Sequence, residues 1–102
     1  MCSSDLYDAE GEKFLEANIA SRKLYGYSAE EFRKLALTDI QGEDEIRRFR
    51  EYVRNRLTTP QRWCHRTKTG RLIDVEVAVQ EIQYGGNTVE LAVVIDVSSR
   101  RQ

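Results

Sequence analysis

The sequence lacks the features that mark a membrane-spanning or a secreted protein. Its longest unbroken apolar run extends only from Leu91 to Ile95, whereas a membrane-spanning helix needs roughly 20 apolar residues. The two cysteines, Cys2 and Cys64, lie far apart, and no basic start followed by an apolar stretch marks the N-terminus. We therefore expect free thiols in a reducing compartment, a cytoplasmic location and no direct insertion into a membrane.

Neither sign of charge is in excess. The chain has 16 basic and 17 acidic side chains and a formal net charge of −1, which gives it no overall attraction to nucleic acid. Arg47, Arg50 and Arg54 form a basic stripe at helical spacing, but acidic residues such as Glu43 stand four positions before basic ones. This spacing favours a solvated, salt-bridged helix face. We expect no nucleic-acid partner.

A single histidine and two distant cysteines also limit the chemistry of any site. His65 follows Cys64 directly, but successive side chains of a strand point to opposite faces, so the pair cannot act as a nucleophile and its base. These residues also lack the paired spacing of a structural metal site. The Lys-Thr-Gly sequence ending at Gly70 lacks the Ser-x-x-Lys motif of acyl-transfer enzymes and is interpreted as a hairpin turn. We expect no catalytic residue and no metal.

The first part of the chain predicts a hairpin followed by a short helix. A length of 102 residues is that of one domain. Residues 6–18 contain two short apolar pairs on either side of an Asp/Gly turn, which is typical of two paired strands. Asn18 can cap a helix that ends at Gly26, with Ile19 and Leu24 facing inward.

Two further helices are expected. Ser28 and Glu31 have the spacing of a capping box, which predicts a helix that continues to about Leu35. From Glu43 onward an acidic first turn and a basic last turn complement a helix dipole. Apolar residues then recur at steps of three and four, which places them on one helical face. They are Ile46, Phe49, Val53 and Leu57.

After Pro60 the apolar period changes to two, which predicts strands. The segments "QRWCHRT", "LIDVEVAV" and "VELAVVID" would be joined by turns at "KTG" and "GGN". The predicted fold class is therefore α+β, with two strands, three helices and three strands in that order.

Taken in order, several segments resemble the PAS domain, a sensory module. They are "DAEGEKFLEAN", "LYGYSAEEF", "LTDI", "HRTKTGRLIDVEV" and the terminal "VVIDVSSRRQ". The resemblance implies one PAS domain over residues 1–102, with a core over about 6–97 and the start of a linker to an output domain at 98–102. It also implies a five-stranded antiparallel sheet in the order 2-1-5-4-3, with helices packed on one face.

The resemblance further implies a role in signal transduction. PAS domains are sensory and dimerisation modules, usually without enzymatic activity, in larger proteins such as two-component histidine kinases or diguanylate cyclases. The partners implied by that role are a second copy as a homodimer, an output domain of the same parent chain, and a small-molecule ligand. The parent chain could be a membrane-anchored sensor with this domain in the cytoplasm. A haem- or flavin-binding receptor is the alternative, and a small α+β enzyme is a further one.

A ligand pocket is implied between the helices and the sheet. Leu37 stands where light-oxygen-voltage flavin photosensors carry their reactive cysteine, and the long helix contains no histidine for haem. We therefore expect neither of these cofactors and leave the ligand unassigned. The residues expected to line the pocket are Phe32, Leu37, Phe49, Val53, Trp63, Val75, Val77, Leu91 and Val93.

The resemblance also implies roles for two other sets of residues. Glu31 and Lys68 match positions that form a salt bridge between the helical layer and the sheet. Such a pair, if partly exposed, contributes about 1 kcal/mol or less. The end of the last strand matches the point where relatives pass the signal to an output linker. Its residues are Asp96, Ser98, Arg100 and Arg101.

Overall fold

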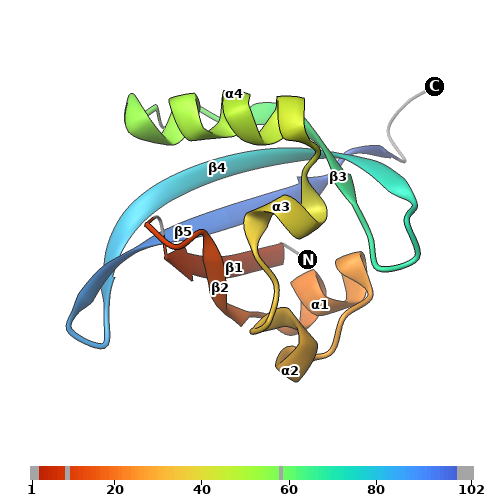
Figure 1. Ribbon diagram of the computed structural model, residues 1–102, viewed down its shortest axis with the longest axis horizontal. Helices are drawn as coiled ribbons and strands as arrows, with labels where there is room; N and C mark the ends of the chain where they lie inside the picture. Colours follow the sequence, from red (N-terminus) through yellow and green to blue (C-terminus); the bar gives the residue numbers. More distant parts are fainter. Residues whose placement is uncertain (1–2, 9, 58, 99–102) are drawn as a thin grey trace.

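The structure, a computed structural model, describes residues 3–8, 10–57 and 59–98. It contains a five-stranded antiparallel sheet in the order β2-β1-β5-β4-β3, as expected from the sequence. Figure 1 shows β4 and β5 as long, curved ribbons that extend beyond the other strands. The strands are β1 (Ser3–Asp8), β2 (Lys13–Ala17), β3 (Gln61–Arg66), β4 (Leu72–Tyr84) and β5 (Asn87–Asp96).

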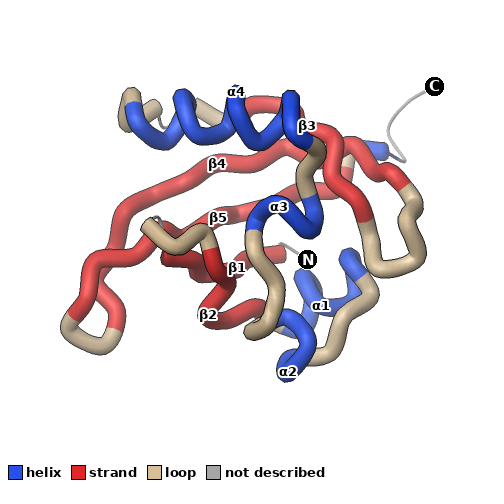
Figure 2. The backbone as a smooth tube through the Cα atoms, in the orientation of Figure 1, coloured by secondary structure: helices blue, strands red, loops and turns tan. Residues whose placement is uncertain are grey.

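Four helices connect β2 to β3 and pack over one face of the sheet (Figure 2). One of them was not predicted, because a helix of four residues is too short to show periodicity. It begins where the Ala36 amide donates to the Asp39 carboxylate at 2.8 Å. The helices are α1 (Ile19–Tyr25), α2 (Ala29–Phe32), α3 (Leu37–Ile40) and α4 (Glu43–Arg54).

The first helix begins and ends where the sequence predicts, and Leu24, one of its two predicted inward residues, packs against the core. The Asn18 side chain accepts a hydrogen bond from the Ser21 amide at 2.8 Å, and Gly26 ends the helix with φ at 86°, a left-handed value that glycine adopts without strain. Ile19 is 58% exposed, so its predicted inward orientation is wrong. It occupies the first helical position, whereas Tyr25 in the last turn is fully buried.

The capping box of α2 is present. The Ser28 hydroxyl accepts from the Glu31 amide at 3.1 Å, and the Glu31 carboxylate accepts from the Ser28 amide at 2.8 Å. The helix is nevertheless shorter than predicted and ends at Phe32. The Leu35 amide bonds to the Phe32 carbonyl three residues earlier, and such bonds tighten the chain into a turn.

The long helix buries most of the predicted stripe, with Val53 partly buried against the core. Ile46, Phe49 and Tyr52 are buried, whereas Leu57 is 43% exposed. The helix ends at Arg54, so Leu57 lies beyond it and no longer follows the helical spacing.

The register of β5 against β4 decides which of its residues face the helices. Val94 pairs with Val77, and both are buried in the core together with Ala92. Leu91 and Val93 therefore point to the other face and are partly exposed, so their prediction as pocket residues is wrong. The segment is apolar on both faces, and alternation alone could not distinguish them.

Trp63 on β3 packs against two aromatic side chains of α4, and substitution of Trp63 tests this packing. The indole is 2% exposed and meets the rings of Phe49 and Tyr52 edge-on, at centroid distances of 5.2 and 5.6 Å. We expect Trp63→Ala to lower the free energy of unfolding by about 3–5 kcal/mol, measured by urea denaturation. Arg62→Ala, at an exposed neighbouring position, is the control, and an equal loss in both variants would contradict this packing.

Candidate functional site

A cluster of polar side chains lies inside the apolar core. Its members come from β1, α1, β3 and the residue that follows α3, and each has an exposed fraction of 4% or less. Buried polar groups destabilise a fold unless they are hydrogen-bonded, so the cluster is either well paired or functional. The residues of this buried polar cluster are Asp5, Ser21, Tyr25, Gln41 and His65.

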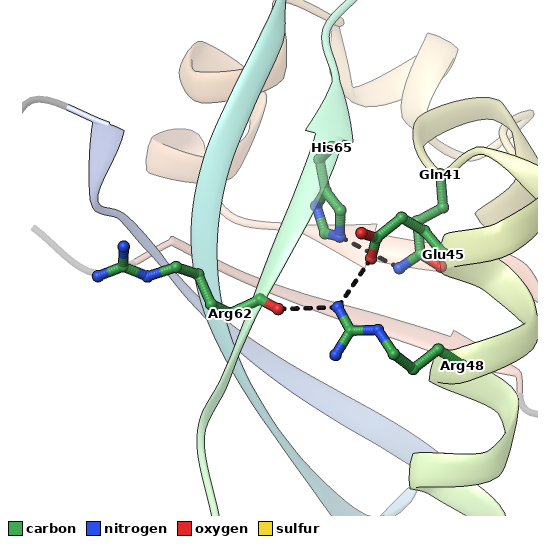
Figure 3. Close-up of polar contacts among 5 residues, drawn as sticks. All are labelled: Gln41, Glu45, Arg48, Arg62 and His65. Atoms are coloured by element: carbon green, nitrogen blue, oxygen red, sulfur yellow. Dashed lines mark hydrogen bonds and ion pairs between the residues drawn. The ribbon is translucent and has the colours of Figure 1, made fainter. Parts of the chain in front are cut away.

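His65 is hydrogen-bonded through both ring nitrogens. Its Nδ1 lies 2.6 Å from the Tyr25 hydroxyl, and its Nε2 lies 3.1 Å from the Gln41 amide nitrogen, a contact that Figure 3 also shows. The two contacts hold the ring in one orientation between Tyr25 and Gln41. Burial lowers the pKa of His65 from 6.5 to about 4, so the ring is neutral at physiological pH.

Asp5 is a carboxyl group that stays protonated at neutral pH. Burial raises its pKa from 3.8 to about 8, because removal from water disfavours the charged form. The Ser21 hydroxyl lies beside the carboxyl and lowers this pKa a little, but it completes no well-aligned hydrogen bond with a described residue. The buried polar cluster is therefore uncharged near pH 7.

The interior next to the cluster is almost completely filled. A void of about 10 Å³ lies between Asp5, Gln41, His65 and the surrounding apolar side chains. This is about the volume that one water needs. Haem or flavin does not fit here, because the space is far too small and both nitrogens of His65 are already hydrogen-bonded to side chains.

The residues predicted to line a pocket are distributed over three places. Leu37, Phe49 and Val77 line the small void. Leu37 and Phe49 also border, with Val53, a separate groove beside α4. The others do not meet at one cavity. Phe32 packs against Phe14 and Tyr25, Trp63 against α4, and Val75 is fully buried, while Leu91 and Val93 lie on the opposite face.

The Glu31–Lys68 pair expected from the resemblance is present. The Lys68 ammonium lies 2.7 Å from the Glu31 carboxylate, and both side chains are about half exposed. The Lys68 amide also donates to the Tyr25 carbonyl at 2.9 Å. These two contacts hold the turn after β3 against the first two helices.

Arg48 is a second link between helix and sheet, and sequence reasoning missed it. Its guanidinium lies 3.9 Å above the Trp63 ring and donates to the Glu45 carboxylate at 3.1 Å and the Arg62 carbonyl at 3.0 Å. Figure 3 shows this side chain reaching from α4 to β3. The acidic partner stands three residues earlier and not four, and the ring contact joins segments that only the fold brings together.

Cys64 and His65 lie on opposite faces of β3, as predicted. His65 is in the core, whereas Cys64 is partly exposed on the other face. Burial, followed by the nearby Asp74 and Glu45, raises the pKa of the Cys64 thiol. A thiol that stays protonated is a weak nucleophile.

The end of β5 is fastened to the start of β4. The Ser98 hydroxyl accepts from the Asp74 amide at 2.7 Å, and the Ser98 amide donates to the Asp96 carboxylate at 3.0 Å. Arg100 and Arg101, also predicted for signal relay, lie outside the described residues.

The chain belongs to the PAS domain family, because the profile of that family matches residues 4–99. Comparison with curated protein sequences gives no significant match. Solved structures agree on the fold. A PAS domain from Colwellia psychrerythraea has a TM-score of 0.82 at 18% identity, covering 97% of this chain and 88% of the other.

Two further structures are similar to the same extent. A PAS domain of a two-component sensor histidine kinase has a TM-score of 0.79 at 20% identity, covering 93% of this chain and 84% of the other. An RNA-binding light-oxygen-voltage receptor has a TM-score of 0.79 at 20% identity, and the match covers 97% of this chain but only 30% of the receptor. At these identities the likeness shows the fold alone.

Within the described parts of the chain, no helix is long and apolar enough to cross a membrane. The same residues include no group of three or more His, Cys, Asp or Glu side chains that could hold a metal ion.

The buried polar cluster makes stability depend on pH in an unusual way. Between about pH 4 and 8 the folded chain keeps the Asp5 proton that the unfolded chain has released, so stability falls as pH rises. His65 has the opposite effect between about 4 and 6.5, where the unfolded chain binds the extra proton. We expect these two contributions to cancel below pH 6.5 and stability to fall by about 2 kcal/mol between pH 6.5 and 8.

Asp5→Asn tests this account, since it removes the titrating group. Urea unfolding at a series of pH values should show no such fall in the variant, and the rise due to His65 should then be visible at lower pH. Asp8→Asn, a partly exposed position on the same strand, is the control and should keep the wild-type profile. An unchanged profile in Asp5→Asn would show that Asp5 is ionised in the fold.

The exposed Glu31–Lys68 pair should contribute little to stability. In a double-mutant cycle of Glu31→Gln and Lys68→Met we expect a coupling energy no larger than the experimental error, because water screens both half-exposed groups. Glu31→Gln retains a side chain that can accept the capping bond from Ser28. A coupling energy several times larger would mean that the pair is shielded from water.

Proposed function

We propose that this PAS domain is a sensory and dimerisation module of a larger signalling protein, of the histidine kinase or diguanylate cyclase type. It acts without enzymatic activity of its own. A change at its ligand site or dimer interface is relayed to an output domain of the same parent chain. The proposal is supported by family membership and by the absence of an activated nucleophile at Cys64 and His65 in the described structure.

The outer face of the sheet supports dimerisation. Opposite the helices, β5 presents three partly buried apolar side chains, and the neighbouring strands add Leu6 and Ala78 beside the polar Ser4, Glu76 and Gln80. Val93 is at the middle of this face, because β5 pairs there with Ser4 of β1 and Ala78 of β4. Contiguous exposed apolar surface is typical of an interface, and a second copy is the proposed partner. The apolar members of this outer face are Leu6, Ala78, Leu91, Val93 and Ile95.

Strand β5 is the proposed path of the signal. Its inward residues Ala92 and Val94 border the void beside the buried polar cluster, while its outward residues lie on the proposed dimer face. Its end is fastened to β4 through Ser98. A shift of this strand would therefore change the interior, the interface and the exit toward an output domain together, as a two-state relay requires. Asp96 and Ser98, followed by Arg100 and Arg101, are the proposed relay residues.

The proposal includes neither nucleic acid nor a resident cofactor. In the basic stripe of α4, Arg50 is already paired with Glu12 at 2.6 Å, and Arg47 is near Asp44 at 4.0 Å. The RNA binding named for one structural neighbour is a property of that receptor. A cytoplasmic location is part of the proposal, since it suits a free thiol such as Cys64.

The oligomeric state of the purified domain tests the dimer. We expect sedimentation velocity to show a dimer that Val93→Glu converts to a monomer without loss of the circular dichroism spectrum, because a buried unpaired carboxylate opposes association. Leu57→Glu, the same kind of change at an exposed site on the helical side, should leave the dimer intact. A wild-type monomer, or equal dimerisation in both variants, would refute dimerisation through the outer face.

A further inference from the structure

A groove of about 240 Å³ beside the second half of α4 is bordered by three of the residues predicted to line a ligand pocket. Its apolar walls are Leu37, Phe49 and Val53, and the Glu12–Arg50 ion pair borders it. The volume is just below the roughly 300–1,000 Å³ of sites for drug-sized ligands. The groove therefore suits a small molecule with an apolar body.

Tyr7 of β1 contributes a buried polar group to this groove. The side chain is 2% exposed, and its hydroxyl has no hydrogen-bond partner among the described residues. Burial, with Glu90 and Glu12 among the nearby acids, raises the pKa of Tyr7, so the hydroxyl keeps its proton and can donate. Buried donors of this kind are rarely left unpaired, and a ligand that offers an acceptor would satisfy it.

Arg54 contributes a cation to the same groove. Unlike Arg50, which Glu12 holds, Arg54 forms no hydrogen bond or ion pair in the described parts of the chain. Its guanidinium is therefore available to an anionic group of a ligand in the groove.

We propose that the groove binds a small organic monocarboxylate. The carboxylate accepts hydrogen bonds from the Tyr7 hydroxyl and the Arg54 guanidinium, and the apolar body lies on Leu37, Phe49 and Val53. A charged acceptor forms stronger bonds with these donors than a neutral one. The inference rests on the proposed sensory function and deepens it, because such a ligand would join β1 of the sheet to α4.

Titration of the intact domain with sodium benzoate tests the proposal, with sodium hexanoate as an aliphatic probe and benzamide as a neutral probe of the same shape. Amide chemical shifts should move in a saturable way near Tyr7, Phe49, Val53 and Arg54. We expect benzoate to bind at least about tenfold more tightly than benzamide, because only benzoate carries the charge. Equal affinity for the two, or no saturable shift with either carboxylate, overturns the proposal.

Two variants test which side chains contact the carboxylate of the ligand. Tyr7→Phe and Arg54→Gln should each weaken benzoate binding about five- to tenfold, whereas Arg47→Gln, an exposed arginine on the same helix that does not border the groove, should not. Tyr7→Phe should fold normally, since the hydroxyl it removes has no partner among the described residues. Wild-type affinity in either folded variant contradicts the proposed binding mode. Sedimentation velocity of the same samples distinguishes failure of the carboxylate proposal from failure of the proposed dimer, because dimerisation can persist when carboxylate binding fails.

Discussion

The hydrogen bonds on the two sides of His65 are the interaction on which the arrangement of this domain most depends. Tyr25 comes from α1, Gln41 from the residue after α3, and His65 from β3. The helices between them are too short to be stable alone, so they need contacts with the sheet to hold their positions. The buried polar cluster supplies directional contacts there, while the aromatic side chains of α4 and Trp63 supply apolar area.

Because the interior of the domain is filled, a ligand or partner would bind at the surface of the domain. The void beside the buried polar cluster has a volume of about 10 Å³, so a change inside can be little more than a proton or a water. The groove beside α4 and the apolar outer face are larger and accessible. Both surfaces involve the central strands. Tyr7, which borders the groove, pairs with Glu90 of β5, and Val93 of the same strand points to the outer face. A signal at either surface therefore acts on one element.

Sequence patterns predicted most of the fold because its elements carry strong local signals. The caps at Asn18 and Ser28 and the alternation after Pro60 were sufficient for α1, α2 and the last three strands. The orientation of β5 was missed because it is apolar on both faces, and its register depends on pairing with β4. The buried polar cluster was harder to predict from the sequence than the fold. Asp5 occupies a polar position in a strand, where solvent exposure is the usual expectation, and the partners of His65 lie 24 and 40 residues away in the chain.

The most direct test of the central claim is the titration of the His65 ring nitrogens by long-range ¹H–¹⁵N NMR. His65 is the chain's only histidine, so the signals need no further assignment. A buried ring fixed by Tyr25 and Gln41 should show one tautomer and should stay neutral down to about pH 5, since its pKa is about 4. Titration near 6.5 with mixed tautomers would mean that the ring is solvated and that the buried polar cluster does not hold the helices to the sheet.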